Sequence, residues 1–261
     1  MDLGLRGKVF VVTGGASGIG EGITRGLHAE GAIPIVVGRD PDRAGALVAE
    51  LGSGHFITVE LGTPESCAET ARQAIARHGR IDGLINNAGA NDGVGLEHGS
   101  PQEFEQSLVR NLHHYYHLTH YLLGSLKETK GSIINISSKT AVTGQGGTSA
   151  YAAAKGAQLA LTREWAVELL PYGIRVNAVV PSEVMTPLYR SWLESFADPG
   201  SKQRDIESRI PLHQRMTTTR EIADMVLFLL SERASHITGQ HLFVDGGYVH
   251  LDRALAGIRK K

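Results

Sequence analysis

The segment that decides the fold runs from residue 9 to residue 20 and reads Val9-Phe-Val-Val-Thr-Gly-Gly-Ala-Ser-Gly-Ile-Gly20. Its four successive apolar residues are typical of a strand that is covered on both faces, and the glycines after them permit a tight turn. A helix that begins near Ile19 would direct its unpaired N–H groups and the positive end of its dipole toward that turn. Strand, glycine-rich turn and helix in this order predict a cradle for the pyrophosphate of a dinucleotide.

Short β-branched segments alternate along the whole chain with amphipathic segments of helical length, which is typical of repeated βαβ units. We expect strands at Val9–Thr13, Ile33–Gly38, His55–Glu60, Gly83–Asn86, Ser132–Ser137, Arg175–Val180 and His241–Val244. We expect helices at Ile19–Glu30, Pro41–Leu51, Pro64–His78, Gln102–Glu128, Tyr151–Leu170 and Thr219–Ser231. The predicted fold class is therefore α/β, with a single Rossmann-type doubly wound domain over residues 1–261, a seven-stranded parallel sheet and helices on both faces.

One segment, residues 183–211, has a mixed aromatic and polar character instead of a clear period. Long connections in compact domains are usually functional or disordered, so we expect this segment to be a mobile lid over the substrate. We interpret residues 248–261 as a C-terminal tail.

Composition excludes several classes of protein. The 26 Lys and Arg residues nearly balance the 27 Asp and Glu residues, and a net charge of -1 gives no attraction to nucleic acid or anionic membranes. Cys67 is the single cysteine, which excludes an intrachain disulfide and fits a reducing compartment. No apolar run approaches the ~18 residues that span a bilayer, and residues 1–8 lack the pattern of a signal peptide. We expect a cytoplasmic protein without a nucleic-acid or membrane partner.

Several further motifs follow the glycine-rich turn in a fixed order. Asn86-Asn-Ala-Gly89 follows the fourth expected strand, Asn135-Ile-Ser-Ser138 closes the fifth, and Tyr151-Ala-Ala-Ala-Lys155 opens the next helix. The glycines of the turn are spaced Gly-x-x-x-Gly-x-Gly. With these motifs the chain resembles the short-chain dehydrogenase/reductase family over nearly its whole length. The resemblance implies an oxidoreductase that uses NAD or NADP.

Tyr151 and Lys155 lie one helical turn apart, so their side chains share a face of the helix. A phenol with a pKa near ~10 is a weak base at neutral pH, and a cation within roughly 4–6 Å favours its charged form. By itself this pair equally fits an ordinary exposed helical pair. The resemblance implies that Tyr151 transfers a proton and that Ser138 holds the substrate oxygen. It further implies that Lys155 also binds ribose hydroxyls and that Asn111 supports a water relay behind the lysine.

The end of the second expected strand bears on the choice of cofactor. Gly38 stands where NAD-preferring relatives commonly carry Asp, and Arg39 follows it. Arg can pair with a 2′-phosphate that an acidic side chain would repel, so NADP is favoured, with NAD as the alternative. Asp40 could instead reach a ribose hydroxyl, and Arg39 could be a solvated loop residue. The resemblance implies that the cofactor-binding residues are Gly14, Ser17, Gly18, Ile19, Gly20, Arg39, Glu60, Leu61, Asn87, Ala88, Gly89, Tyr151, Lys155, Pro181, Val184 and Thr186.

The segments that frame the substrate in this family are polar here, and a polar lining suits a polyol, because buried hydroxyls need partners. The implied substrate residues are Ser138, Gln145, Tyr151, Glu183 and Tyr189. Three segments, 138–146, 156–165 and 184–189, are similar to bacterial members of the family that oxidise L-fucose at the anomeric carbon to a lactone. The alternatives are a 3-oxoacyl or hydroxysteroid reductase of the same family and a cofactor-sensing regulator without chemistry.

The middle helix is crowded with histidines, namely His113, His114, His117 and His120. A metal site needs convergent ligands, usually with a cysteine or carboxylate, and the sequence places none there, so we expect no metal. In this family the helix packs in a subunit interface, and the resemblance implies a homotetramer in which the tail beginning at Tyr248 makes contacts.

Overall fold

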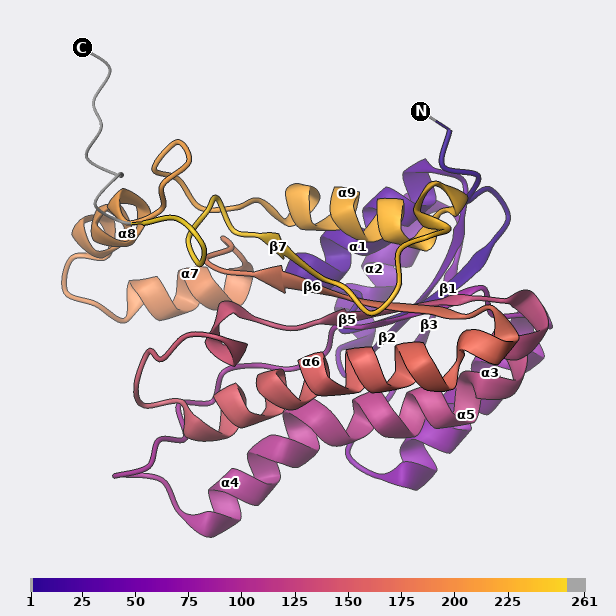
Figure 1. Cartoon of the computed structure of the whole chain (residues 1–261), viewed down its shortest axis with the longest axis horizontal. Coiled ribbons are helices and arrows are strands. Elements are labelled where there is room, and N and C mark those ends of the chain that lie inside the picture. The colour runs from indigo at the N-terminus through magenta and orange to yellow at the C-terminus, as the bar shows by residue number, and fades with distance from the viewer. Residues whose placement is uncertain (1, 253–261) are drawn as a thin grey trace.

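The structure is a computed structural model, and it describes residues 2–252. Seven parallel strands form one sheet in the order β3-β2-β1-β4-β5-β6-β7 (Figure 1). The predicted fold class, a doubly wound parallel sheet, is thereby confirmed. The strands are β1 (Val9–Thr13), β2 (Ile33–Gly38), β3 (His55–Thr58), β4 (Gly83–Asn86), β5 (Ser132–Ile136), β6 (Arg175–Pro181) and β7 (His241–Val244).

Helices cover both faces of the sheet. Successive side chains along a strand point to opposite faces, so alternate residues pack against different helices. Val9 and Val11 of β1 pack with α3, α5 and α6, whereas Phe10 and Val12 pack with α1 and α9 (Figure 1). All four side chains are essentially inaccessible to solvent. The helices named so far are α1 (Gly18–Ala29), α3 (Pro64–His78), α5 (His114–Thr129), α6 (Ser149–Glu168) and α9 (Thr219–Leu230).

The middle helix differs from the single helix expected over residues 102–128. Helix α4 (Pro101–Leu108) is followed by a π-helical turn, Val109–His113, and then by α5. Such turns insert extra backbone into a helix and are frequent at functional sites. Asn111 lies at the centre of this one and is fully buried.

Residues 183–211 contain two helices that the sequence pattern did not indicate, α7 (Pro187–Glu194) and α8 (Pro199–Ser208). Each begins with proline behind a capping side chain: Thr186 accepts a hydrogen bond from the Tyr189 N–H, and Asp198 accepts one from the Ser201 N–H. Both helices lie beyond the carboxyl end of the sheet (Figure 1). That this segment moves stays a prediction.

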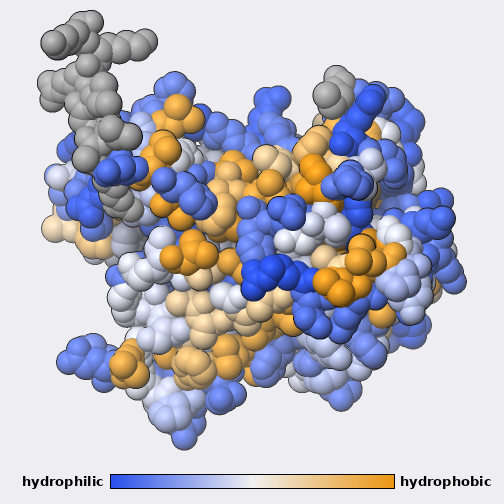
Figure 2. All heavy atoms as spheres, in the orientation of Figure 1, coloured by the Kyte–Doolittle hydropathy of each residue, from blue (hydrophilic) through white to orange (hydrophobic). Residues whose placement is uncertain are grey.

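On the face drawn in Figure 2, hydrophobic side chains are scattered over the middle and hydrophilic ones border them. The large exposed apolar side chains include Leu188, Trp192 and Phe196 of the 183–211 segment. Within residues 2–252, no helix has both the length and the apolarity needed to cross a membrane.

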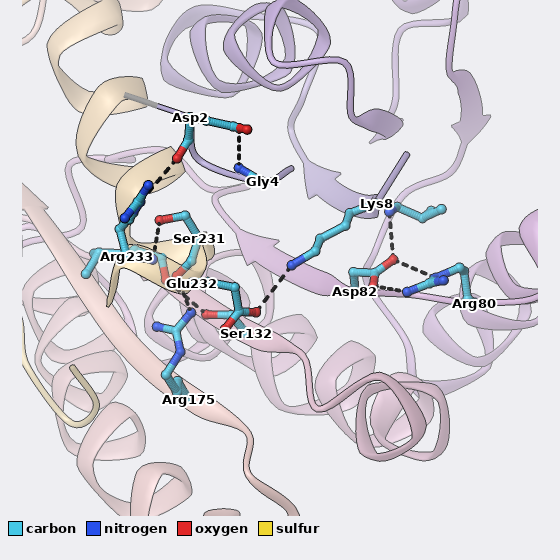
Figure 3. Close-up of polar contacts among 12 residues, drawn as sticks. Asp2, Gly4, Lys8, Arg80, Asp82, Ser132, Arg175, Ser231, Glu232 and Arg233 are labelled. Atoms are coloured by element: carbon cyan, nitrogen blue, oxygen red, sulfur yellow. Dashed lines mark hydrogen bonds and ion pairs between the residues drawn. The ribbon is translucent and has the colours of Figure 1, made fainter. Parts of the chain in front are cut away.

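The amino edge of the sheet is closed by a polar network (Figure 3). Asp82, which is 7% exposed, accepts a hydrogen bond from the Val9 N–H at 2.9 Å and another from the Arg80 guanidinium at 2.9 Å. Lys8 forms a separate ion pair with Glu232. Asp82 therefore ties the start of β1 to the start of β4.

Replacing Asp82 with alanine should lower the free energy of unfolding by about 1–3 kcal/mol, because the buried Val9 N–H loses its acceptor. Urea denaturation monitored by circular dichroism measures this loss. Arg80→Ala is the matched control, and it should cost only about 0–1 kcal/mol because that ion pair is half exposed. Equal costs for the two variants would contradict this account of the Val9 contact.

Candidate active site

Four segments meet at the carboxyl edge of the sheet, at the ends of β1, β4, β5 and β6. In the sheet order β1 lies between β2 and β4, so the chain leaves β1 and β4 toward opposite sides of the sheet. Such a switch point opens a crevice in doubly wound sheets, and ligands bind there. The motifs from the sequence all lie at this edge.

The glycine-rich turn is shaped by close backbone approaches. A Cβ on Gly20 would lie 2.1 Å from the Gly14 carbonyl oxygen, and Gly14 itself has φ +63. Ser17 precedes α1 without a side-chain capping bond, so the first N–H groups of the helix are open to a ligand. Gly18 packs against Thr186, because a Cβ added to Gly18 would lie 3.2 Å from the Thr186 Cβ. This contact places the start of α7 beside the turn.

Asn87 fixes this turn from the neighbouring strand. Its side-chain amide donates to the Thr13 carbonyl at 2.8 Å, and the backbone N–H groups of Asn87 and Ala88 donate to the Thr13 hydroxyl at 2.8 and 2.9 Å. Gly89 follows with φ +145, and a Cβ there would lie 2.7 Å from the Asn111 side-chain oxygen. The Asn-Ala-Gly motif therefore needs an amide at its first residue and no side chain at its last.

At the far end of the crevice, Arg39 and Glu60 form an ion pair at 3.5 Å. Both side chains are about three-quarters exposed, at 74% and 76%, so a ligand can compete for either. Asp40 is otherwise engaged, because its carboxylate accepts from the Arg43 N–H and caps α2 (Pro41–Leu51). The Arg43 guanidinium donates to the Ser17 hydroxyl at 3.2 Å. One guanidinium, that of Arg43, thus lies beside the turn, and another, that of Arg39, lies at the end of β2 beside Glu60.

The remaining predicted cofactor residues lie along the same edge. Leu61 packs against the core below Glu60. Pro181 ends β6 and pairs with Val244, while Val184 forms an isolated bridge with Thr217. These contacts hold the backbone on which Thr186 is presented to Gly18.

Tyr151 lies in the first turn of α6, beside the Ser138 hydroxyl that follows β5. Burial raises the pKa of Tyr151 to about 12; a hydrogen bond with the Ser138 side chain acts against this rise, and the charge of Asp92 adds to it. The Ser138 hydroxyl also accepts from the Thr140 N–H at 3.3 Å. The structure therefore brings together the two hydroxyls that the motifs singled out.

Lys155 lies one turn further along α6 and is 3% exposed. Its ammonium is 5.5 Å from the centre of the Tyr151 ring, and burial lowers its pKa to about 7. Within this distance a protonated lysine favours the charged form of the phenol. The expected sharing of one helix face is thus found.

Asn111 lies behind this pair, in the π-helical turn. Its side-chain oxygen accepts from the Ala90 N–H at 2.8 Å, and its side-chain amide donates to the Ser107 carbonyl at 3.1 Å. Its backbone carbonyl accepts from the Gln158 side chain at 2.7 Å. A water relay at Asn111 stays a prediction.

Glu183, one of the predicted substrate residues, is the centre of a small charged cluster. It forms an ion pair with Lys139, and both side chains are largely buried, at 13% and 9% exposed. The Tyr189 hydroxyl donates to the other carboxylate oxygen of Glu183 at 2.7 Å. The Lys139 ammonium also lies 4.2 Å from the centre of the Tyr248 ring. Lys139 directly follows Ser138 in the chain, and Glu183 lies just after β6, the strand that pairs with β5, so the cluster and the Ser138–Tyr151 pair come from neighbouring segments.

Gln145 lies apart from this cluster, exposed in the loop that precedes α6. Asp92 is largely buried, accepting from the Ser107 hydroxyl at 3.0 Å and from Arg110 at 2.9 Å. Its effect on the Tyr151 pKa shows that it borders the same site.

The histidines of the middle helix separate into two environments. His114 is buried at 2% exposed, and one ring nitrogen lies 3.0 Å from the Arg110 carbonyl. His113 and His117 make a ring contact at 6.1 Å, and His120 stacks on Tyr116. Over residues 2–252 no group of three or more His, Cys, Asp or Glu side chains is arranged to hold a metal ion. Tetramer formation stays a prediction, and most of the 248–261 tail lies outside the described residues.

Sequence reasoning missed three residues of the site: Arg43, Tyr115 and Gln158. Gln158 stands three residues after Lys155 on one helix and so shares its face, which is a signal that the sequence contained. Tyr115 is fully buried and reaches Lys155 only through the packing of α5 against α6. No local pattern could have indicated that contact.

Comparison with known proteins agrees with this architecture. The model of the enoyl-(acyl carrier protein) reductase family matches residues 14–249. The L-fucose dehydrogenase of Bos taurus is 37% identical, with 95% of this chain and 92% of that protein covered. The 3-oxoacyl-[acyl-carrier-protein] reductase of Thermotoga maritima is 33% identical, with 94% and 99% covered.

Two solved structures are similar over nearly the full length. The Cj0485 dehydrogenase has a TM-score of 0.94 at 46% identity, with 98% of this chain and 99% of that chain covered. The Thermoplasma acidophilum aldohexose dehydrogenase has a TM-score of 0.88 at 30% identity, with 100% of both chains covered. The chain belongs to the short-chain dehydrogenase/reductase family, and it is an NAD(P)-dependent oxidoreductase.

Proposed function

We propose that this oxidoreductase oxidises an aldose, L-fucose or a sugar of related configuration, at its anomeric carbon to the lactone, with NADP as the favoured cofactor. The observation that carries the proposal is the Lys139–Glu183–Tyr189 cluster beside Ser138 and Tyr151. The similarity to the bovine L-fucose dehydrogenase and to the aldohexose dehydrogenase supports it.

The residues present fit a dinucleotide, because the Gly14–Gly20 contact leaves no room for a side chain and the amino end of α1 is uncapped. In this proposal the turn from Gly14 to Gly20 holds the pyrophosphate, and the Asn87–Gly89 segment and Lys155 border the nicotinamide half. When bound, the cofactor supplies a hydride acceptor.

Tyr151 takes the proton of the substrate hydroxyl during oxidation, and Ser138 holds the same oxygen through a hydrogen bond. Burial alone makes Tyr151 a weaker acid, so its phenolate form depends on nearby positive charge. The ammonium of Lys155, 5.5 Å from the ring centre, supplies that charge from within this chain. Tyr151, Ser138 and Lys155 thus have separate roles: to move the proton, to orient the oxygen and to favour the phenolate.

Cofactor preference rests on Arg39 and Arg43. Asp40 is committed to capping α2, so Arg39 is the group at the end of β2 that can meet a 2′-phosphate. Arg43, held beside Ser17, adds a second positive charge nearby. Glu60 pairs with Arg39 and so competes with a 2′-phosphate for its guanidinium. This ion pair is exposed, so breaking it costs little free energy.

The substrate class rests on the cost of burying charge. A long acyl chain or steroid against Lys139 and Glu183 would remove water from the ion pair without offering hydrogen bonds in return. A sugar carries several hydroxyls that can donate to Glu183 and accept from Lys139. The ring oxygen of an aldose also stabilises the positive charge left as hydride departs from the anomeric carbon. We propose Gln145 as a further contact to the sugar hydroxyls, from the loop before α6.

A second candidate function is reduction of a 3-oxoacyl thioester. The similarity to the Thermotoga maritima reductase, at 33% identity over nearly all of both chains, favours it. The same Ser138–Tyr151–Lys155 chemistry would serve there, with Tyr151 donating its proton. The two candidates differ in what faces Glu183.

Tyr151→Phe should lower kcat by ~10²–10⁴-fold, the usual contribution of a general acid or base. The change of nicotinamide absorbance with time measures turnover. Titration with NADPH, followed by its fluorescence, should give a Kd close to that of the unaltered protein. Tyr172→Phe, a replacement on the protein surface, is the matched control and should leave both unchanged. A near-native kcat in the Tyr151→Phe variant would contradict the proposed proton-transfer role of Tyr151.

Arg39→Ala should weaken NADP binding by about 1.5–3 kcal/mol, roughly ten- to hundredfold, because one charge-assisted contact is lost. NAD binding should change far less. Glu60→Gln should instead strengthen NADP binding, because it releases Arg39 from its ion pair. Isothermal titration of both nucleotides decides the matter, with Arg72→Ala on the remote helix α3 as control; equal losses for NADP and NAD would contradict discrimination by Arg39.

Purified protein should oxidise L-fucose, L-galactose and D-arabinose with NADP. Glu183→Ala and Gln145→Ala should each lower kcat/KM for these sugars, by about tenfold or more for Glu183→Ala, because a sugar hydroxyl loses its hydrogen-bond partner. NADPH affinity serves as the internal control and should not change. If the protein turns over none of the three sugars but reduces a 3-oxoacyl thioester, the aldose proposal is wrong and the second candidate takes its place.

A further inference from the structure

The ammonium of Lys155 directs all three of its hydrogen-bonding positions to groups of the protein. It donates to the Ile136 carbonyl at 2.8 Å, to the Gln158 side-chain oxygen at 3.2 Å and to the Tyr115 hydroxyl at 3.4 Å. The three acceptors come from β5, α6 and α5. All of them are uncharged, so they fix the position of the ammonium without neutralising it.

Gln158 is the member of this set that joins two parts of the site. Its side chain is fully buried, and its amide nitrogen donates to the Asn111 carbonyl at 2.7 Å in the π-helical turn. One amide thus accepts from the lysine at one end and donates to the turn at the other. A side-chain amide is uncharged and carries its acceptor and its donors on two separate atoms, so it can serve both partners at once.

The choice of an amide has an electrostatic consequence. A glutamate at this position would also hold the ammonium, but its negative charge would oppose the field that the ammonium exerts on Tyr151. An apolar side chain would leave one N–H of a buried ammonium without an acceptor, which favours the neutral amine. Gln158 avoids both outcomes.

We propose that Gln158 is a positioning residue, which holds the Lys155 ammonium against the π-helical turn so that its charge acts on the Tyr151 hydroxyl. The proposal rests on the proposed role of Tyr151 but is independent of which substrate is oxidised. Gln158 touches neither Tyr151 nor Ser138 in the hydrogen bonds of the site and acts through Lys155.

The titratable groups around the ammonium come from each element packed against it. Tyr151 lies on the same helix, and Tyr115 and His114 lie on α5. Burial raises the pKa of Tyr115 well above its ordinary value and lowers the pKa of His114 to about 4, so both stay neutral over the working range. Asp92 acts on Tyr151 from the loop after β4. Changes at residue 158 should therefore appear in the titration of Tyr151 and Lys155.

The test compares Gln158→Met and Gln158→Glu in the full chain with NADPH bound. Ultraviolet difference spectra report tyrosinate formation, and subtraction of a Tyr151→Phe background isolates Tyr151, so no substrate is needed. In both variants the apparent pKa of Tyr151 should rise by about one unit: methionine favours neutral Lys155, and glutamate opposes its charge. Activity in the direction of oxidation should fall about tenfold at neutral pH in both, because one pKa unit lowers the phenolate fraction tenfold.

The two variants should separate at higher pH. Glutamate still holds the lysine in place, so kcat of Gln158→Glu should rise toward that of the unaltered protein as the pH is raised, whereas kcat of Gln158→Met should stay about tenfold low. Thr70→Val is the matched control: it removes another buried hydrogen bond, in α3, and should lower Tm without moving the titration.

An unshifted Tyr151 titration in the folded Met variant would show that Gln158 is only structural and would overturn the proposal. Should the Met variant not fold, the Glu variant decides alone, since an unshifted titration there has the same meaning. If the unaltered protein has no aldose activity, the proposed substrate is wrong, but this spectroscopic result still stands.

Discussion

A buried ammonium without a buried counter-charge is the constraint on which the rest of the site depends. Removing Lys155 from water is costly unless every N–H finds an acceptor, and burial alone already lowers its pKa to about 7. Its acceptors lie on β5, α5 and α6. The strand order, the packing of α5 and α6 on one face of the sheet, and the π-helical turn together bring those acceptors to one point.

The glycine-rich turn answers a different constraint, one of space instead of charge. Gly14 and Gly20 approach so closely that no side chain fits between them, and Asn87 on the neighbouring strand holds the turn through the Thr13 carbonyl. Because β1 and β4 are adjacent, the cradle and the reacting groups share the same edge. Parallel strand order thus brings the glycine-rich turn and the Ser138–Tyr151 pair to the same end of the sheet, where we propose that the phosphates and the substrate bind.

The proposed substrate and cofactor ends of the crevice differ in how their charged side chains are paired. Arg39 and Glu60 pair in the open, where the pair costs little to break and a phosphate can compete. Lys139 and Glu183 pair in a largely buried place, where breaking the pair is costly and a ligand must offer hydrogen bonds to both. An exposed pair suits a site that exchanges one anionic partner for another, and a buried pair suits recognition of neutral hydroxyls.

The sequence by itself determined the parallel doubly wound sheet, the glycine-rich turn between β1 and α1, and the spacing of Tyr151 and Lys155. These depend on local patterns: apolar runs, glycine positions and the helical turn. Strand ends were placed within two residues, and the helices beginning at Pro41 and Pro64 were placed with the starts that the structure has. Only the tertiary structure decided the π-helical turn at Asn111, the helices in the 183–211 segment, and the contacts of Lys155 with Tyr115 and of Lys139 with Glu183. Each of these contacts joins residues at least forty positions apart, and their partners are chosen by the packing of whole elements, which no local pattern encodes.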